Sequence, residues 1–207
     1  NNSDLIVIGE IDTASMIIFW FHGYGSNNWS FEPVMKMLNL SMENDVCIIM
    51  PNAPNVDNKR SWYPLPTSNS AGTIEEDHDG LRKSKNHISE FIKSFKLNKE
   101  QKIIIGGFSQ GAALSLSMLF ETDHIFNGCI ALSGYMPSAE YHKNFEIAEC
   151  NIFIAHGYSD QAISFKDYEK TMDFLSSKTS QITSYTGDFG HTVTKEVNNK
   201  ILEWLKK

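Results

Sequence analysis

The sequence contains no apolar run long enough to cross a membrane. The longest candidate, Met16 to Phe21, has the length of a strand, whereas a membrane-spanning helix needs roughly 18 apolar residues or more. No secretory signal pattern is visible near the beginning of the sequence. We therefore expect no integral membrane segment.

The sequence also lacks an excess of positive charge. Its 18 Lys and Arg residues stand against 25 Asp and Glu residues, which gives a formal net charge of −7. Because binding to phosphate backbones needs a basic face, this balance argues against nucleic acid as a partner.

Cysteine is scarce, and the Cys-x-x-Cys spacing is absent. The three cysteines, Cys47, Cys129 and Cys150, are an odd number and lie within or beside apolar runs. This pattern predicts buried free thiols in a reducing compartment, and hence a cytoplasmic protein.

Repeats, low-complexity segments and linkers are absent as well. The 207 residues, of which 41% are hydrophobic, suffice for one domain with a substantial core. We expect a single domain over residues 1–207.

Short apolar runs alternate with segments of helical periodicity along the chain. The expected strands are 5–8, 16–21, 46–50, 103–105, 127–133, 151–155 and 182–185; the expected helices are 29–40, 75–95, 112–120, 165–175 and a terminal helix after 191. This alternation predicts an α/β fold with a largely parallel sheet between helix layers. In such sheets the site lies outside the carboxyl ends of the strands.

One long segment, Asn55 to Thr73, has neither a helix nor a strand period. It is rich in Pro, Ser and Asn but also contains Trp62, Tyr63 and Leu65. Loops of this length in compact domains are often functional, and the aromatic residues favour a cover over a site. A loop that simply packs on the surface is an equal alternative.

The stretch from Gly107 to Gly111 matches the G-x-S-x-G pattern of a nucleophile elbow. An apolar run precedes it and a run rich in Ala and Leu follows. So sharp a turn from strand to helix strains the backbone at Ser109 and brings the two glycines close together, where only glycine leaves room. We therefore predict that Ser109 is a nucleophile.

A serine nucleophile needs a neighbouring base, and the best of the seven histidines is His191. It follows a strand and a Gly-rich turn, and we expect it to open the terminal helix, whose positive end keeps the ring neutral. His22 and His156 each precede a glycine at a strand end. Their rings are expected to fix loop geometry through hydrogen bonds.

Asp160 is the first choice for the acid that orients His191. It ends the loop after a buried strand and gives the chain order serine, acid, histidine of α/β-hydrolases. Asp167 and Asp173 are expected to lie on a helix and face water, and Asp123 is expected to lie away from the catalytic edge of the sheet. Asp188 is close to His191 in sequence and remains an alternative.

A tetrahedral intermediate also needs two preorganised N–H donors. One is expected to be the backbone N–H of Gln110, directly after the nucleophile. The other should come from the loop after an earlier strand. The segment His22-Gly23-Tyr24-Gly25 fits, with the Tyr24 N–H as the donor.

Six blocks together resemble the phospholipase/carboxylesterase family, which includes the acyl-protein thioesterases. They are His22-Gly23-Tyr24-Gly25, Pro51-Asn52-Ala53-Pro54, Gly107-Phe108-Ser109-Gln110-Gly111-Ala112, Leu132-Ser133-Gly134-Tyr135-Met136-Pro137, His156-Gly157-Tyr158-Ser159-Asp160 and Gly190-His191. The resemblance implies an α/β-hydrolase fold, a Ser109, Asp160, His191 triad, oxyanion donors at Tyr24 and Gln110, and neither a metal nor an organic cofactor.

The sequence departs from the family pattern near the expected acyl site. The family commonly has Leu at the position of Tyr24, an acidic residue at Ser26, Trp-Phe-Asp at Trp62-Tyr63-Pro64 and a second Gly at Ala112. We expect Trp62, Leu65, Met136 and Tyr24 to line an apolar acyl site.

These observations favour a serine hydrolase that cleaves carboxylic esters of small molecules or lipids through an acyl-enzyme. A thioesterase or lysophospholipase that acts on long acyl chains is the nearest alternative. A non-catalytic α/β-hydrolase relative used for binding is the alternative from another class.

Overall fold

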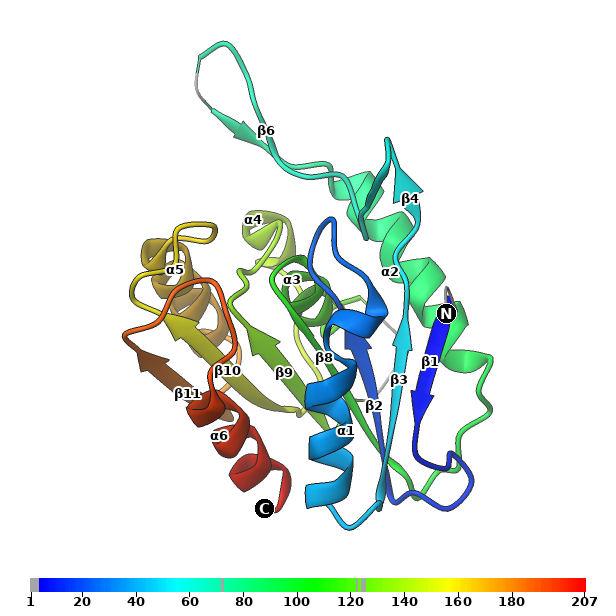
Figure 1. The fold of residues 1–207 in the computed structure, drawn as a ribbon. Helices are drawn as coiled ribbons and strands as arrows, with labels where there is room; N and C mark the ends of the chain where they lie inside the picture. Colours follow the sequence, from blue (N-terminus) through cyan, green and yellow to red (C-terminus); the bar gives the residue numbers. More distant parts are fainter. Residues whose placement is uncertain (1–3, 72, 122, 124–125) are drawn as a thin grey trace.

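A seven-stranded sheet forms the centre of the molecule in this computed structural model, which describes residues 4–71, 73–121, 123 and 126–207 (Figure 1). The strand order is β1-β3-β2-β8-β9-β10-β11. The strands are β1 (Leu5–Ile8), β2 (Met16–Phe21), β3 (Val46–Pro51), β8 (Lys102–Phe108), β9 (Gly128–Leu132), β10 (Asn151–Gly157) and β11 (Ile182–Gly187). β1 pairs antiparallel with β3, and the other pairings are parallel.

Helices cover both faces of this sheet (Figure 1). They are η1 (Asn28–Ser30), α1 (Glu32–Ser41), α2 (His78–Lys93), α3 (Gln110–Ser117), α4 (Ala139–His142), α5 (Phe165–Ser176) and α6 (Lys195–Leu205). Residues of α1 and α6 share one core cluster, and residues of α2, α3 and α5 share the other. The expected α/β fold with a mostly parallel sheet is confirmed.

The sheet is buried because its central strands are apolar on both faces. Every residue of β2 and β3 is buried, as parallel strands between two helix layers require. Alternate residues of β2 serve the two layers: Ile17 and Phe19 belong to the α2–α3–α5 side, and Ile18 and Trp20 to the α1–α6 side.

Several predicted helix boundaries were wrong, and the start points of two helices show the reason. The expected helix over 75–95 begins at His78, because the Asp77 carboxylate accepts a hydrogen bond from the Gly80 N–H and caps the helix, as N-cap residues do. Glu75 instead pairs in a short strand. The terminal helix begins at Lys195, where Thr194 provides the cap by accepting from the Val197 N–H.

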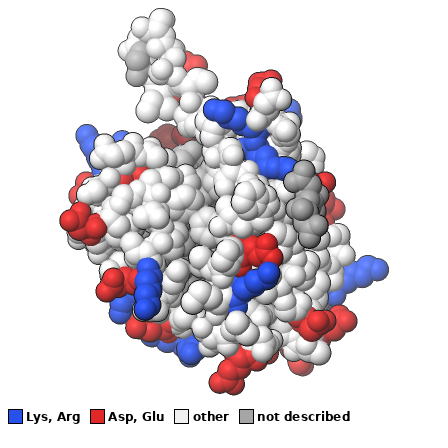
Figure 2. Space-filling view, viewed as in Figure 1, with Lys and Arg blue, Asp and Glu red and all other residues white. Residues whose placement is uncertain are grey.

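The segment Asn55–Thr73 is not the featureless loop that its sequence predicts. It contains a small hairpin, β4 (Asn55–Val56) with β5 (Lys59–Arg60), and one strand of a second hairpin, β6 (Thr67–Ser68) with β7 (Ile74–Glu75). We call residues 65–71 and 73–75 the arm, since they project from the body of the molecule (Figures 1 and 2).

Charge is spread over the visible face without a large patch of one sign (Figure 2). No helix in the described part of the chain combines the length and apolar character that a membrane span requires.

Candidate active site

Ser109 lies at a strained turn between β8 and α3. Its backbone has φ of 55° and ψ of −117°, a region that non-glycine residues seldom adopt. A Cβ added to Gly111 would lie 2.0 Å from the Phe21 carbonyl oxygen, and one added to Gly107 would lie 2.5 Å from the Gly111 carbonyl carbon. The expected close approach of the two glycines is confirmed, and the geometry is that of a nucleophile elbow.

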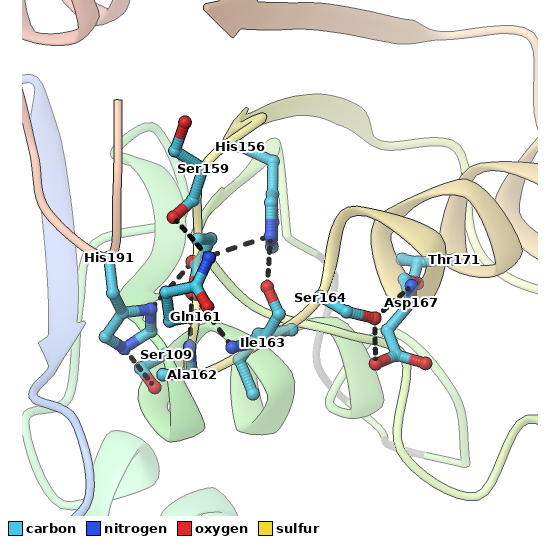
Figure 3. Close-up of polar contacts among 11 residues, drawn as sticks. Ser109, His156, Ser159, Gln161, Ala162, Ile163, Ser164, Asp167, Thr171 and His191 are labelled. Carbon is cyan, nitrogen blue, oxygen red and sulfur yellow. Dashed lines mark hydrogen bonds and ion pairs between the residues drawn. The ribbon is translucent and has the colours of Figure 1, made fainter. Parts of the chain in front are cut away.

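His191 faces this serine. Its Nε2 lies 3.0 Å from Ser109 Oγ (Figure 3). Its Nδ1 lies 2.8 Å from Asp160 Oδ2. The ring also packs against Phe108, with 4.7 Å between ring centroids. The expectation that His191 opens the terminal helix was wrong, because α6 begins four residues later. Hydrogen bonds to side chains, rather than a helix end, therefore orient this ring.

Asp160 is buried and held on both carboxylate oxygens. The N–H groups of Ala162 and Ile163 donate to Oδ1 at 2.8 and 2.9 Å, while Oδ2 faces His191. His156 supports the same loop, because its Nε2 donates to the Ile163 carbonyl at 2.9 Å (Figure 3). The expected structural role of the His156 ring is thus confirmed.

The other candidate acids have different partners. The Asp188 carboxylate accepts from Ser159 Oγ at 2.9 Å, and that of Asp167 is bound by Ser164 and Lys170. Asp123 and Asp173 are exposed.

The loop after β2 lies directly beside Ser109. A Cβ added to Gly23 would lie 3.4 Å from Ser109 Cβ, and Tyr24, Ser109 and Gln110 line one cleft. Within the described residues, neither the Tyr24 nor the Gln110 backbone N–H takes part in a turn, loop or cap hydrogen bond to another backbone group. Both are therefore available to an oxygen bound in the cleft.

His22 holds this loop from inside the protein. The Ala53 N–H donates to its Nε2 at 3.1 Å, and its Nδ1 lies 2.8 Å from the Gly23 carbonyl oxygen. Burial lowers the pKa of His22 to about 4, and Arg60 adds to this effect. The ring is therefore neutral at neutral pH, and the loop-fixing role expected for it is confirmed.

A cleft of about 560 Å³ opens at Ser109, a size typical of sites for small ligands. Leu65, Met136 and Tyr24 lie in its wall, as the sequence predicts. Trp62 is not among the lining residues and is only 5% exposed. Its indole N–H instead donates to the His22 carbonyl oxygen at 2.7 Å, which turns the ring away from the cleft and into the protein.

Several cleft residues escaped the sequence analysis. Ile74 of the arm and Ile163 add apolar surface, and Tyr135 adds a hydroxyl whose oxygen lies 2.8 Å from that of Tyr63. Burial raises the pKa of Tyr135, so its hydroxyl stays protonated. The position of Tyr135 just after β9, at the catalytic edge of the sheet, was the signal that could have revealed it.

Comparisons with known proteins show the family of this chain. Residues 2–207 match the family model described as phospholipase/carboxylesterase. The chain belongs to this family. Within the phospholipase/carboxylesterase family, it is 35% identical to acyl-protein thioesterase 1 homolog 1 of Dictyostelium discoideum, over 82% of this chain and 79% of that protein. It is 25% identical to the carboxylesterase SOBER1 of Arabidopsis thaliana, over 94% of this chain and 91% of that protein.

Two solved structures have the same fold. Acyl-protein thioesterase 2 of Zea mays superimposes with a TM-score of 0.85 at 22% identity, covering 98% of this chain and 97% of that one. The Bacillus cereus carboxylesterase superimposes with a TM-score of 0.77 at 20% identity, covering 98% of this chain and 92% of that one. Together with the family match and the curated relatives, this fold makes the chain an α/β-hydrolase of the carboxylesterase and thioesterase type.

Proposed function

We propose that the protein is a serine hydrolase that cleaves carboxylic esters through an acyl-enzyme, with Ser109 as nucleophile, His191 as base and Asp160 as orienting acid. The observation that carries the proposal is the unbroken chain of two hydrogen bonds, 3.0 Å from Ser109 Oγ to His191 Nε2 and 2.8 Å from His191 Nδ1 to Asp160 Oδ2. This is the arrangement that activates a serine hydroxyl at neutral pH.

In the proposed mechanism, His191 Nε2 takes the proton of Ser109 as Oγ adds to the acyl carbonyl carbon. The carbonyl oxygen becomes an oxyanion, which the backbone N–H groups of Tyr24 and Gln110 stabilise. The proton on His191 then passes to the departing alcohol or thiol, and a water molecule activated by His191 releases the acid. Asp160 stabilises the imidazolium that forms in each half-reaction.

The proposed role of Ser109 as nucleophile is tested by removing its hydroxyl group. Ser109→Ala should lower the kcat/KM for a p-nitrophenyl ester at least about 10⁴-fold, since the covalent step has no other nucleophile. The midpoint temperature of thermal unfolding of this variant should stay within a few degrees of that of the unchanged protein. A fluorophosphonate probe should label the unchanged protein and not the variant. Activity retained in Ser109→Ala, or failure of the unchanged protein to react with the probe, would refute the mechanism and revive a binding role.

The second candidate is a thioesterase or lysophospholipase specific for long acyl chains. The apolar part of the cleft wall, formed by Leu65, Ile74, Met136 and Ile163, favours an extended acyl group, and the Dictyostelium relative is named a thioesterase. We expect kcat/KM to rise with chain length in a panel of matched esters and thioesters. A steep fall beyond short chains would restrict the protein to small esters.

We propose a single catalytic domain over residues 1–207 in which the stretch from 55 to 73 covers one side of the cleft. Leu65 and Pro66 of this stretch lie in the cleft wall, which supports the covering role. The three free, buried cysteines support the cytoplasmic location expected from the sequence.

A further inference from the structure

Two consecutive carbonyl groups at the end of β2 are each held by an aromatic side chain. The Trp62 indole N–H donates to the His22 carbonyl oxygen at 2.7 Å, and His22 Nδ1 lies 2.8 Å from the Gly23 carbonyl oxygen. The two rings contact each other, with 5.0 Å between their centroids. Neither ring lines the cleft, so both act from behind the loop.

The hydrogen bonds of His22 fix its tautomer. Its Nε2 accepts from the Ala53 N–H and so carries no proton. The neutral ring must then carry its proton on Nδ1 and donate it to the Gly23 carbonyl oxygen. With 1% of its surface exposed, the ring has no water to compete for this bond.

The held carbonyl determines where the next N–H points. The Gly23 carbonyl and the Tyr24 N–H belong to one peptide unit, which is planar and trans, so the two bonds point in opposite directions. Fixing the carbonyl toward His22 therefore fixes the Tyr24 N–H on the other side. The glycines at 23 and 25, the latter with φ of 69°, would otherwise leave this peptide freer to rotate.

Trp62 also reaches the second N–H donor. Its backbone N–H donates to Gln110 Oε1 at 3.0 Å, and Gln110 Nε2 donates to Ser61 Oγ and to the Tyr63 carbonyl oxygen. The buried Gln110 side chain is thus tied to three successive residues of the segment after β5. One tryptophan connects the strand end that carries the Tyr24 N–H to the helix start that carries the Gln110 N–H.

We propose that His22 and Trp62 are positioning residues that together aim the two oxyanion-binding N–H groups, His22 through the Gly23 carbonyl and Trp62 through the His22 carbonyl and Gln110. This inference rests on the proposed serine-hydrolase function. It gives Trp62 a role in transition-state stabilisation in place of the acyl-site role that its sequence suggests. Removing an oxyanion donor costs about 10²- to 10³-fold in kcat, so a donor that is present but misaimed should cost less.

Two pairs of variants separate aiming from packing. His22→Gln keeps an acceptor for the Ala53 N–H but loses the donor to the Gly23 carbonyl, whereas His22→Asn carries an amide N–H near the place of Nδ1. Trp62→Phe removes the indole N–H and keeps an aromatic ring against Phe21 and His22. Its control is Trp204→Phe on α6, whose ring packs against Phe153.

We expect kcat/KM for a p-nitrophenyl ester to fall about 30- to 100-fold in His22→Gln and about tenfold in Trp62→Phe. His22→Asn should recover most of the loss, and Trp204→Phe should lie within threefold of the unchanged protein. A trifluoromethyl ketone, whose adduct with Ser109 carries an oxyanion, should bind more weakly by the same factors. The matching alkyl ether has no carbonyl and should bind all variants equally.

The outcomes distinguish this inference from the function on which it rests. If Ser109→Ala is inactive while His22→Gln and Trp62→Phe keep full kcat/KM, the positioning role is wrong and the hydrolase function stands. If the variants weaken ether and ketone binding equally, the two residues only support the cleft, and the positioning role is again wrong. Activity retained in Ser109→Ala would instead overturn the function itself.

Discussion

Two histidine-bearing loops meet at Ser109, and they use the same side chain in opposite ways. His22, at the end of β2, is buried, and both its ring nitrogens are engaged with the backbone of its own and a neighbouring loop. His191, after β11, has 25% of its side chain exposed, and its nitrogens face the side chains of Ser109 and Asp160. Both residues adjoin a glycine and follow a strand.

The difference lies in what the ring nitrogens can exchange. A ring whose nitrogens bind backbone groups cannot move a proton without breaking the loop, and burial holds the pKa of His22 near 4. A ring between a hydroxyl and a carboxylate can accept a proton from one and be stabilised by the other. Hydrogen-bond partners, rather than position in the chain, therefore separate a supporting histidine from a base.

The largest effect should come from the proposed base. His191→Gln replaces the imidazole with an amide that is not basic enough to take up the Ser109 proton, so kcat/KM for a p-nitrophenyl ester should fall about 10⁴-fold. The midpoint of thermal unfolding should change by no more than a few degrees, because the ring is partly exposed. A loss below tenfold would show that His191 is not the base and would remove the contrast with His22.

A smaller effect, on stability rather than activity, should come from His22. Because its pKa is about 4 in the folded protein, against the ordinary histidine value of 6.5 in the unfolded chain, the unfolded chain binds more protons between these values. The contribution of the neutral His22 ring to the free energy of unfolding is therefore complete above about pH 6.5 and is lost as the pH falls toward 4. The shift corresponds to about 3 kcal/mol of unfolding free energy.

The measurement is urea unfolding of the unchanged protein and of His22→Asn at pH 7, 5.5 and 4. The difference in unfolding free energy between the two should shrink by about 3 kcal/mol toward pH 4, because His142, whose pKa is also lowered by burial, is common to both proteins and cancels. A difference that is independent of pH would mean that His22 is not a buried neutral ring.

The smallest effect should come from Asp188, the alternative acid for His191. Its carboxylate accepts from Ser159 Oγ on the exposed side of the loop, so Asp188→Asn should leave kcat/KM within about threefold, in keeping with a weak surface hydrogen bond. Asp160→Asn, measured alongside, should lower it about 10⁴-fold. Equal losses in both variants would show that the two carboxylates share the role.

The parts of the site that local sequence could predict are those that one turn of chain builds. The elbow at Ser109 needs glycine two residues to either side, because a Cβ at Gly111 would overlap the Phe21 carbonyl. A pattern of five consecutive residues is therefore enough to predict it. Asp160 and His191 could be chosen because they follow strands, and the carboxyl ends of parallel strands share one edge.

The parts that could not be predicted depend on which segments pack together. Nothing near Trp62 in sequence indicates that its indole N–H meets a carbonyl 40 residues earlier, and an aromatic residue in a loop suggested a ligand contact instead. The hairpins of residues 55–75 were missed because each of their strands has only two residues, too few to show a period.

The sequence by itself determined the fold class and predicted the candidate nucleophile and the order of the three proposed catalytic residues, because alternating apolar runs and glycine spacing act over a few residues. Only the tertiary structure decided which partners give the two histidines their different roles, backbone groups for His22 and side chains for His191, and that Trp62 lies behind the loop after β2 rather than in the cleft. Those outcomes depend on hydrogen bonds between segments about 30 to 80 residues apart, and such partners are chosen only when the whole sheet is assembled.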